Sequence, residues 1–127
     1  MNIGIICTAL LGLLLFGLGL QVSLQRRETR RSIGYDPSPA DPLHRAVRAH
    51  ANTAEYAPFF AVLFLWYATK PAPIWILATI VLATVARFSI AGALLFGPLN
   101  RPNPARLFGA LFTYITGLAL AVGLLAT

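Results

Sequence analysis

Long apolar stretches alternate with short polar connections along the chain. The apolar segments cover residues 3–24, 42–69, 74–96 and 105–126. The first contains no formal charge, and as a helix rising about 1.5 Å per residue it would be roughly 33 Å long, enough to cross a bilayer. The pattern predicts helices at about residues 3–25, 42–69, 74–97 and 104–126, which together form a single domain over residues 1–127.

The connections carry the residues that start and stop helices. Residues 26–42 contain four arginines, three prolines and a glycine, which is typical of a polar surface loop. Asp41 followed by Pro42 predicts an N-cap and a first helical position. Residues 70–73 and 97–104 are also rich in proline, so each predicts a break between two helices.

The composition indicates a membrane protein. Hydrophobic residues make up 57% of the 127 residues and charged residues only 11%, whereas about 25% is usual in a soluble domain. A net charge of +6 could indicate nucleic acid, but the basic residues gather in short clusters between apolar runs. We therefore expect an all-α polytopic membrane protein, a bundle of four transmembrane helices that binds no nucleic acid.

The basic residues also predict an orientation. The second connection holds only Lys70, whereas the first and third connections, with the adjoining helix starts, hold Arg26, Arg27, Arg30, Arg31, Arg45, Arg48, Arg101 and Arg106. Basic loops remain on the cytoplasmic side of a membrane. We expect a multi-pass protein of the cytoplasmic (inner) membrane, if the source is bacterial, with both termini outside.

A polar stripe runs along the second apolar segment. Arg45, Arg48, Asn52 and Glu55 follow at intervals of three, four and three, which places them on one face of a helix beside Tyr56. Charged side chains are costly within a span and are functional candidates for that reason. The set suits a small zwitterionic ligand with carboxylates and an ammonium group. The alternative for the arginines is contact with lipid headgroups.

Arg87 is a basic residue in the middle of the third apolar segment. Arg87 and Glu55 are equally far from Pro71, so an antiparallel hairpin about Pro71 places them at one depth. The same reasoning about the next turn brings Tyr114 to the level of Arg87. An unpaired charge there would be costly, which predicts an ion pair between Glu55 and Arg87. A purely structural clip that sets the helix register is the alternative role.

Other polar or small residues predict structure rather than chemistry. Cys7 stands alone, and no cysteine and histidine cluster has the spacing of metal ligands, so no metal site is expected. His50 lies on a different helix face from Arg48. Gly109, Thr113 and Gly117 form a small-residue face that favours close helix packing.

Residues 45–60, RAVRAHANTAEYAPFF, resemble the second-helix signature of the MAPEG family (membrane-associated proteins in eicosanoid and glutathione metabolism). That signature is Arg-Ala-His/Gln-x-Asn, then Glu three residues later, then a proline and aromatic residues. The positions that fit are Arg48, Ala49, His50, Asn52, Glu55, Pro58, Phe59 and Phe60. The spacing is that of the leukotriene synthase branch and of many bacterial members. Four spans, a basic first loop and Arg106-Leu-Phe-Gly109 extend the match more weakly.

The resemblance implies a homotrimer with glutathione, as co-substrate, held between neighbouring subunits near the cytoplasmic face. It implies that glutathione, or a similar thiol, is bound by Arg48, Asn52, Glu55, Tyr56 and Arg87. Arg106 matches the catalytic arginine credited with activating the thiol. A neighbouring guanidinium favours the thiolate, which is the nucleophile. Membrane lipid is the other expected partner.

The sequence is consistent with three functions. The first is a glutathione transferase or peroxidase acting on lipophilic electrophiles. The second is a non-catalytic MAPEG-like protein that binds a lipid or thiol. The absence of polar rings favours it, because eicosanoid-forming members carry histidine or tyrosine where this chain has Ser89, Ile90 and Leu94. The third is a small proton-coupled exporter. Exporters of this size use a glutamate in the first helix, and residues 3–24 contain no acid.

Overall fold

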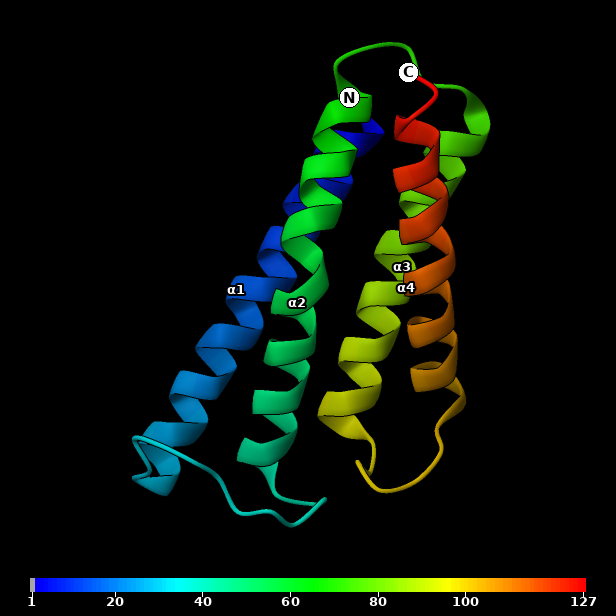
Figure 1. Cartoon of the computed structure of the whole chain (residues 1–127). Helices are drawn as coiled ribbons and strands as arrows, with labels where there is room; N and C mark the ends of the chain where they lie inside the picture. The colour runs from blue at the N-terminus through cyan, green and yellow to red at the C-terminus, as the bar shows by residue number, and fades with distance from the viewer. Residues whose placement is uncertain (1) are drawn as a thin grey trace.

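A computed structural model describes residues 2–127 of the chain. It consists of four helices, α1 (Ile3–Thr29), α2 (Pro42–Ala68), α3 (Ile74–Phe96) and α4 (Pro104–Leu124), and the described residues contain no strand (Figure 1). The chain is thus an all-α bundle, as predicted. Both ends of the described chain lie at the same end of the bundle as the α2–α3 connection.

Three of the helices, α1, α3 and α4, are long and apolar enough to cross a membrane. Helix α2 also has 27 residues, but the polar stripe in its first half keeps it out of this group. It runs beside the apolar helices over the same depth (Figure 1). These features make the chain an integral membrane protein with one polar helix among three apolar ones.

Polar side chains and prolines define the helix ends. Asp41 caps α2 by accepting a hydrogen bond from the His44 N–H at 2.8 Å, and Pro42 takes the first turn. Asn103 caps α4 in the same way at the Ala105 N–H. Helix α1 continues to Thr29, beyond the predicted end near residue 25, and stops at Arg30 with φ 53°. The added turn is polar and begins where the apolar stretch ends, so it can project from the membrane.

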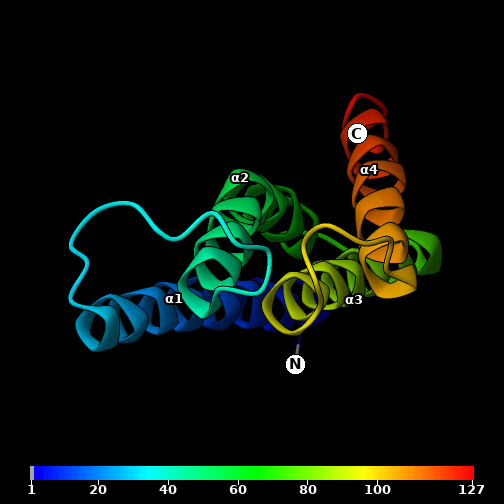
Figure 2. The same cartoon turned by 90° about the horizontal axis from the view of Figure 1, so that it is seen from below.

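Helices α1, α2 and α3 pack against one another, whereas α4 packs along α3 and barely meets α2. Seen from below, α4 runs in a different direction from α1 and α3 (Figure 2). The close fit of α4 on α3 depends on Gly109. A Cβ atom at that position would lie 2.6 Å from the Ile90 Cβ and 2.7 Å from the Ala86 carbonyl oxygen. The result is a tight α3–α4 pair and an open side between α2 and α4.

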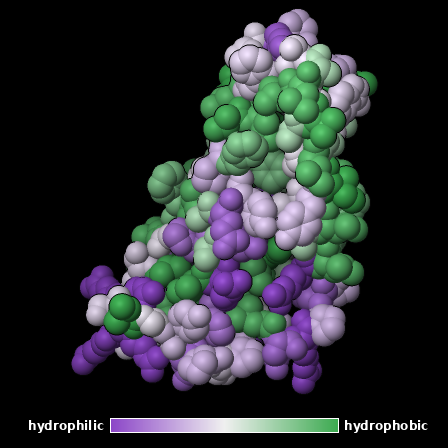
Figure 3. Space-filling view, in the orientation of Figure 1, coloured by the Kyte–Doolittle hydropathy of each residue, from purple (hydrophilic) through white to green (hydrophobic). Residues whose placement is uncertain are grey.

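The two ends of the bundle differ in polarity. A cluster of buried apolar residues, among them Phe64, Ile80 and Leu120, fills the end near the α2–α3 connection. Hydrophilic side chains gather at the opposite end, and part of this polar surface extends upward between the apolar flanks (Figure 3). Many large apolar side chains face outward, for example Phe16 at 78% exposure, as expected for a surface that meets lipid.

Candidate functional site

Arg87 lies at the centre of the polar end, where it joins three helices. From α3 it donates hydrogen bonds to the Asn52 carbonyl oxygen of α2 at 2.9 Å and to the Asn52 side-chain oxygen. It also donates to the Thr113 hydroxyl of α4 at 3.1 Å. The side chain is completely buried, and its guanidinium lies 5.0 Å from the centre of the Tyr56 ring. Neutral acceptors and an aromatic face therefore surround this buried cation.

The structure does not form the predicted ion pair between Glu55 and Arg87. The hydrogen-bond partners of Arg87 are Asn52 and Thr113, and Glu55 is exposed. The reason is angular. Equal distance from Pro71 gives equal depth, but Asn52 and Glu55 differ by about 60° around the helix, at about 100° per residue. Asn52 faces α3, and Glu55 faces the open side between α2 and α4.

A polar pocket of about 180 Å³ adjoins this centre. Five of the residues predicted to form the site line it: Arg48, Asn52, Tyr56, Arg87 and Arg106. The structure thus brings together side chains from α2, α3 and α4. Three guanidinium groups and no acidic side chain line the pocket, so it favours an anionic ligand. Arg48 is itself exposed and Arg106 is half-buried.

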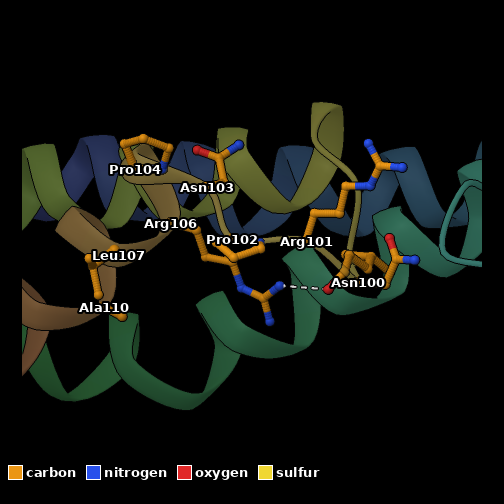
Figure 4. Close-up of a pocket in the computed structure, with 9 residues that line it drawn as sticks. Asn100, Arg101, Pro102, Asn103, Pro104, Arg106, Leu107 and Ala110 are labelled. Carbon is orange, nitrogen blue, oxygen red and sulfur yellow. Dashed lines mark hydrogen bonds between the residues drawn. The ribbon is translucent and has the colours of Figure 1, made fainter.

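Arg106 stands where α4 begins and is fixed by the α3–α4 connection. It donates a hydrogen bond to the Leu99 carbonyl oxygen at 2.9 Å, reaching back across the connection (Figure 4). It also lines a second, larger pocket of about 640 Å³ formed by that connection and the first turns of α4. Figure 4 shows the side chains of Arg101 and Arg106 pointing away from each other. Arg106 therefore connects the polar pocket with the end of the bundle.

An apolar pocket of about 360 Å³ continues the same groove further along α2 and α4. Glu55 lines this pocket rather than the polar one, and Phe59, Phe60, Leu63, Leu118 and Ala121 contribute its apolar wall. Tyr56, Thr113 and Tyr114 line both pockets. The groove thus passes from a basic compartment to an apolar one without leaving the α2–α4 side of the molecule.

Two residues of this site were absent from the predicted set. The sequence predicts only a packing role for Thr113, but in the structure its hydroxyl also accepts a hydrogen bond from Arg87. The hydroxyl of Tyr114 lies 3.3 Å from the hydroxyl of Tyr56. Equal depth with Arg87 was the signal that pointed to Tyr114. No sequence signal distinguishes the hydrogen-bonding role of Thr113 from its packing role.

Other candidates lie outside the groove. A Cβ atom at Gly19 of α1 would lie 3.3 Å from His50 Nε2, so His50 faces α1 and not the polar pocket. Cys7 is buried in the apolar core. Within residues 2–127 no group of three or more histidine, cysteine, aspartate or glutamate side chains is placed to hold a metal ion.

The family model described as MAPEG family matches residues 4–126, which is nearly the whole chain. No curated protein and no solved structure matches the chain.

Proposed function

The chain belongs to the MAPEG family, and from this premise we propose that it is a glutathione-dependent transferase or peroxidase acting on lipophilic electrophiles. The family membership supports a membrane protein of the glutathione-related group. One observation carries the finer proposal: a basic pocket and an apolar pocket meet in a single groove between α2 and α4. Such a groove suits a charged thiol on one side and an apolar electrophile on the other.

The basic compartment offers specific contacts for glutathione. Arg48 and Arg106 can pair with its carboxylates and its sulfur, because a guanidinium presents several N–H donors in a plane. Arg87 is held by Asn52 and Thr113, so its part is to add positive charge and fix the wall of the pocket. Glu55 is exposed beside Tyr56, where its carboxylate can accept hydrogen bonds from the ammonium group of the tripeptide.

Arg106 is the proposed catalytic residue. The glutathione thiol loses its proton to water, and the adjacent guanidinium stabilises the resulting thiolate. Arg106 cannot act as a base, because arginine keeps its proton at working pH. In the transferase reaction a carbon–sulfur bond forms while the leaving group departs with its electron pair. In the peroxidase reaction the thiolate sulfur bonds to a hydroperoxide oxygen, the O–O bond breaks, and the departing oxygen takes up a proton and leaves as an alcohol. A second glutathione then attacks the sulfur of the resulting sulfenic acid, so that water leaves and glutathione disulfide is formed.

The open side of the molecule supports a homotrimer. Arg48 and Glu55 are exposed on the groove between α2 and α4, where the single subunit leaves its polar stripe uncovered. A neighbouring subunit would cover this stripe and complete the site. We place the site near the arginine-rich end, on the cytoplasmic side of an inner membrane, with the termini outside.

A second candidate is a non-catalytic protein that binds a thiol or a lipid. The apolar character of Ile90 and Leu94 favours this candidate. Both line the polar pocket, at positions where the resemblance places polar rings in eicosanoid-forming members. The two side chains present no hydroxyl or imidazole to a bound substrate.

Titration of the purified protein with glutathione, followed by thiolate absorbance, tests the proposal. We expect saturable thiolate formation at neutral pH and turnover of chlorodinitrobenzene. S-methylglutathione, which cannot ionise at sulfur, is the control ligand and should compete without producing the signal. Thiolate formation without turnover of any electrophile would favour the non-catalytic candidate. Absence of saturable glutathione binding would contradict the transferase proposal and would leave the second candidate only as a lipid-binding protein.

A further inference from the structure

Two tyrosines stand at the boundary between the basic and apolar compartments. Tyr56 of α2 and Tyr114 of α4 line both pockets and face each other across the groove. Their hydroxyl oxygens are 3.3 Å apart, and their rings meet edge to face with centroids 6.0 Å apart. A thiolate on the basic side and an electrophile on the apolar side would therefore react next to these two hydroxyl groups.

The third residue shared by the two pockets has no proton to offer. The Thr113 hydroxyl donates its hydrogen bond to the Gly109 carbonyl oxygen at 2.6 Å and accepts one from Arg87. The two phenols differ from it because their hydrogen bond is to each other. Each phenol has one proton, so one of the two remains free to donate to a molecule in the groove.

Accessibility selects Tyr114 as that donor. Its side chain is 54% exposed along the groove, whereas Tyr56 is half-buried with its ring over the Arg87 guanidinium. When Tyr56 donates to the oxygen of Tyr114, the Tyr114 proton points away from the pair and toward the groove. This arrangement makes Tyr56 a positioning residue for Tyr114.

We propose that Tyr114 is a catalytic general acid that protonates the departing oxygen of a lipophilic epoxide. The proposal rests on the glutathione-dependent activity proposed above. The glutathione sulfur forms a bond to an epoxide carbon, the carbon–oxygen bond breaks, and the electron pair stays on that oxygen. The Tyr114 phenol gives its proton to this alkoxide, and the phenolate recovers a proton from water. The product is a thioether with a hydroxyl on the adjacent carbon.

A general acid is needed here because of the leaving atom. An alkoxide is strongly basic, and the apolar wall of Phe59, Phe60 and Leu63 offers it no hydrogen-bond donor. A chloride ion leaves without taking up a proton. Chlorodinitrobenzene and styrene oxide are therefore a matched pair of probes, since both are small aromatic electrophiles and only the epoxide requires protonation.

The test compares kcat for the two probes at saturating glutathione in detergent-solubilised protein. We expect Tyr114→Phe to lower the ratio of epoxide to aryl chloride turnover about 100-fold, within the usual range for a general acid. Tyr56→Phe breaks the same hydrogen bond but keeps the Tyr114 hydroxyl, so the ratio should fall far less. Tyr35→Phe, at a ring stacked on His44 that lines neither pocket, is the matched control and should leave the ratio unchanged.

The outcomes separate this inference from the function on which it depends. A wild-type protein that turns over neither probe contradicts the proposed transferase activity. A wild-type protein that turns over both, with an equal ratio in Tyr114→Phe, overturns the role of Tyr114 alone. A larger fall of the ratio in Tyr56→Phe than in Tyr114→Phe would also overturn it, because the acid would then be Tyr56.

Discussion

The two ends of the bundle are made from the same four helices but are stabilised in different ways. At the end near the α2–α3 connection, Phe64, Ile80 and Leu120 are buried in a continuous apolar cluster. At the arginine-rich end a second apolar cluster, which includes Leu18, Ala49 and Leu94, is joined by the hydrogen bonds of Arg87, which link α2, α3 and α4 beside a polar pocket. The first arrangement depends on shape and volume, whereas the second depends in addition on the direction of individual donors and acceptors.

This difference has a consequence for function. Dispersion contacts are non-directional, so an apolar cluster tolerates a change of side chain of similar volume. Hydrogen bonds to a buried guanidinium require particular atoms at particular positions. The directional contacts of the polar end therefore fix the wall of the pocket, while apolar clusters at both ends pack the helices together.

The largest effect on stability is expected at Arg87. Arg87→Ala should lower the free energy of unfolding by about 3–5 kcal/mol, because it leaves a cavity and two polar partners unsatisfied. Arg87→Lys should recover little, since an ammonium lacks the planar fork that reaches both Asn52 and Thr113. Denaturant titration in detergent measures both variants.

Leu63 is the matched comparison at the apolar end, where it is 2% exposed. Leu63→Ala should cost about 2–5 kcal/mol, and Leu63→Met should recover most of it, to within about 1.5 kcal/mol of the wild type. If lysine rescued position 87 as well as methionine rescues position 63, the distinction between the two ends would not hold.

Arg106 should affect chemistry more than stability. We expect Arg106→Ala to lower turnover about 100-fold, as for the loss of one donor to a developing anion. The pKa of the bound glutathione thiol should rise, so the thiolate signal should appear at higher pH than in the wild type. Arg106→Lys keeps the charge and should recover part of both effects.

Arg27 provides the control for this experiment, since it is an exposed arginine at the same end of the bundle. Arg27→Ala should change neither turnover nor the pH at which the thiolate forms. Wild-type turnover by Arg106→Ala at saturating glutathione would assign Arg106 to lipid headgroups and not to catalysis.

Alanine substitutions at two glycines of α4 should change the stability of the protein in opposite directions. Gly109→Ala should destabilise by about 1–3 kcal/mol, because its Cβ would lie 2.6 Å from the Ile90 Cβ. Gly117→Ala places its Cβ 3.5 Å from Phe60, an ordinary contact, and should stabilise by up to about 1 kcal/mol through helix propensity. Thermal unfolding of the two variants side by side measures the difference, and equal effects would show that α4 shifts freely on α3.

The smallest effect concerns a directional bond within the apolar end. The Tyr67 hydroxyl donates to the Leu120 carbonyl oxygen at 2.7 Å and joins α2 to α4. Tyr67→Phe should cost about 0.5–1.5 kcal/mol, because one hydrogen bond is lost while the ring remains packed. A loss as large as that of Arg87→Ala in the same denaturant titration would mean that the apolar end also depends on hydrogen-bond direction.

The sequence by itself determined the membrane class, the helices and the residues of the polar stripe. Long apolar runs separated by prolines predict spanning helices, because in a bilayer only a helix satisfies every backbone group within a single segment. The spacing of Arg48, Asn52 and Glu55 also placed them on one helix face. These conclusions depend on period and composition, which are local properties of the chain.

Only the tertiary structure decided which residue meets Arg87 and where the groove divides. Distance from a turn predicts the depth of a residue in the bundle but not its direction around the helix axis. Asn52 and Glu55 point in directions about 60° apart, and Asn52 is the one that faces Arg87. The pairing of Tyr56 with Tyr114 depends on how closely Gly109 lets α4 approach α3. Such angles and approaches arise from packing between helices, which no single helix encodes.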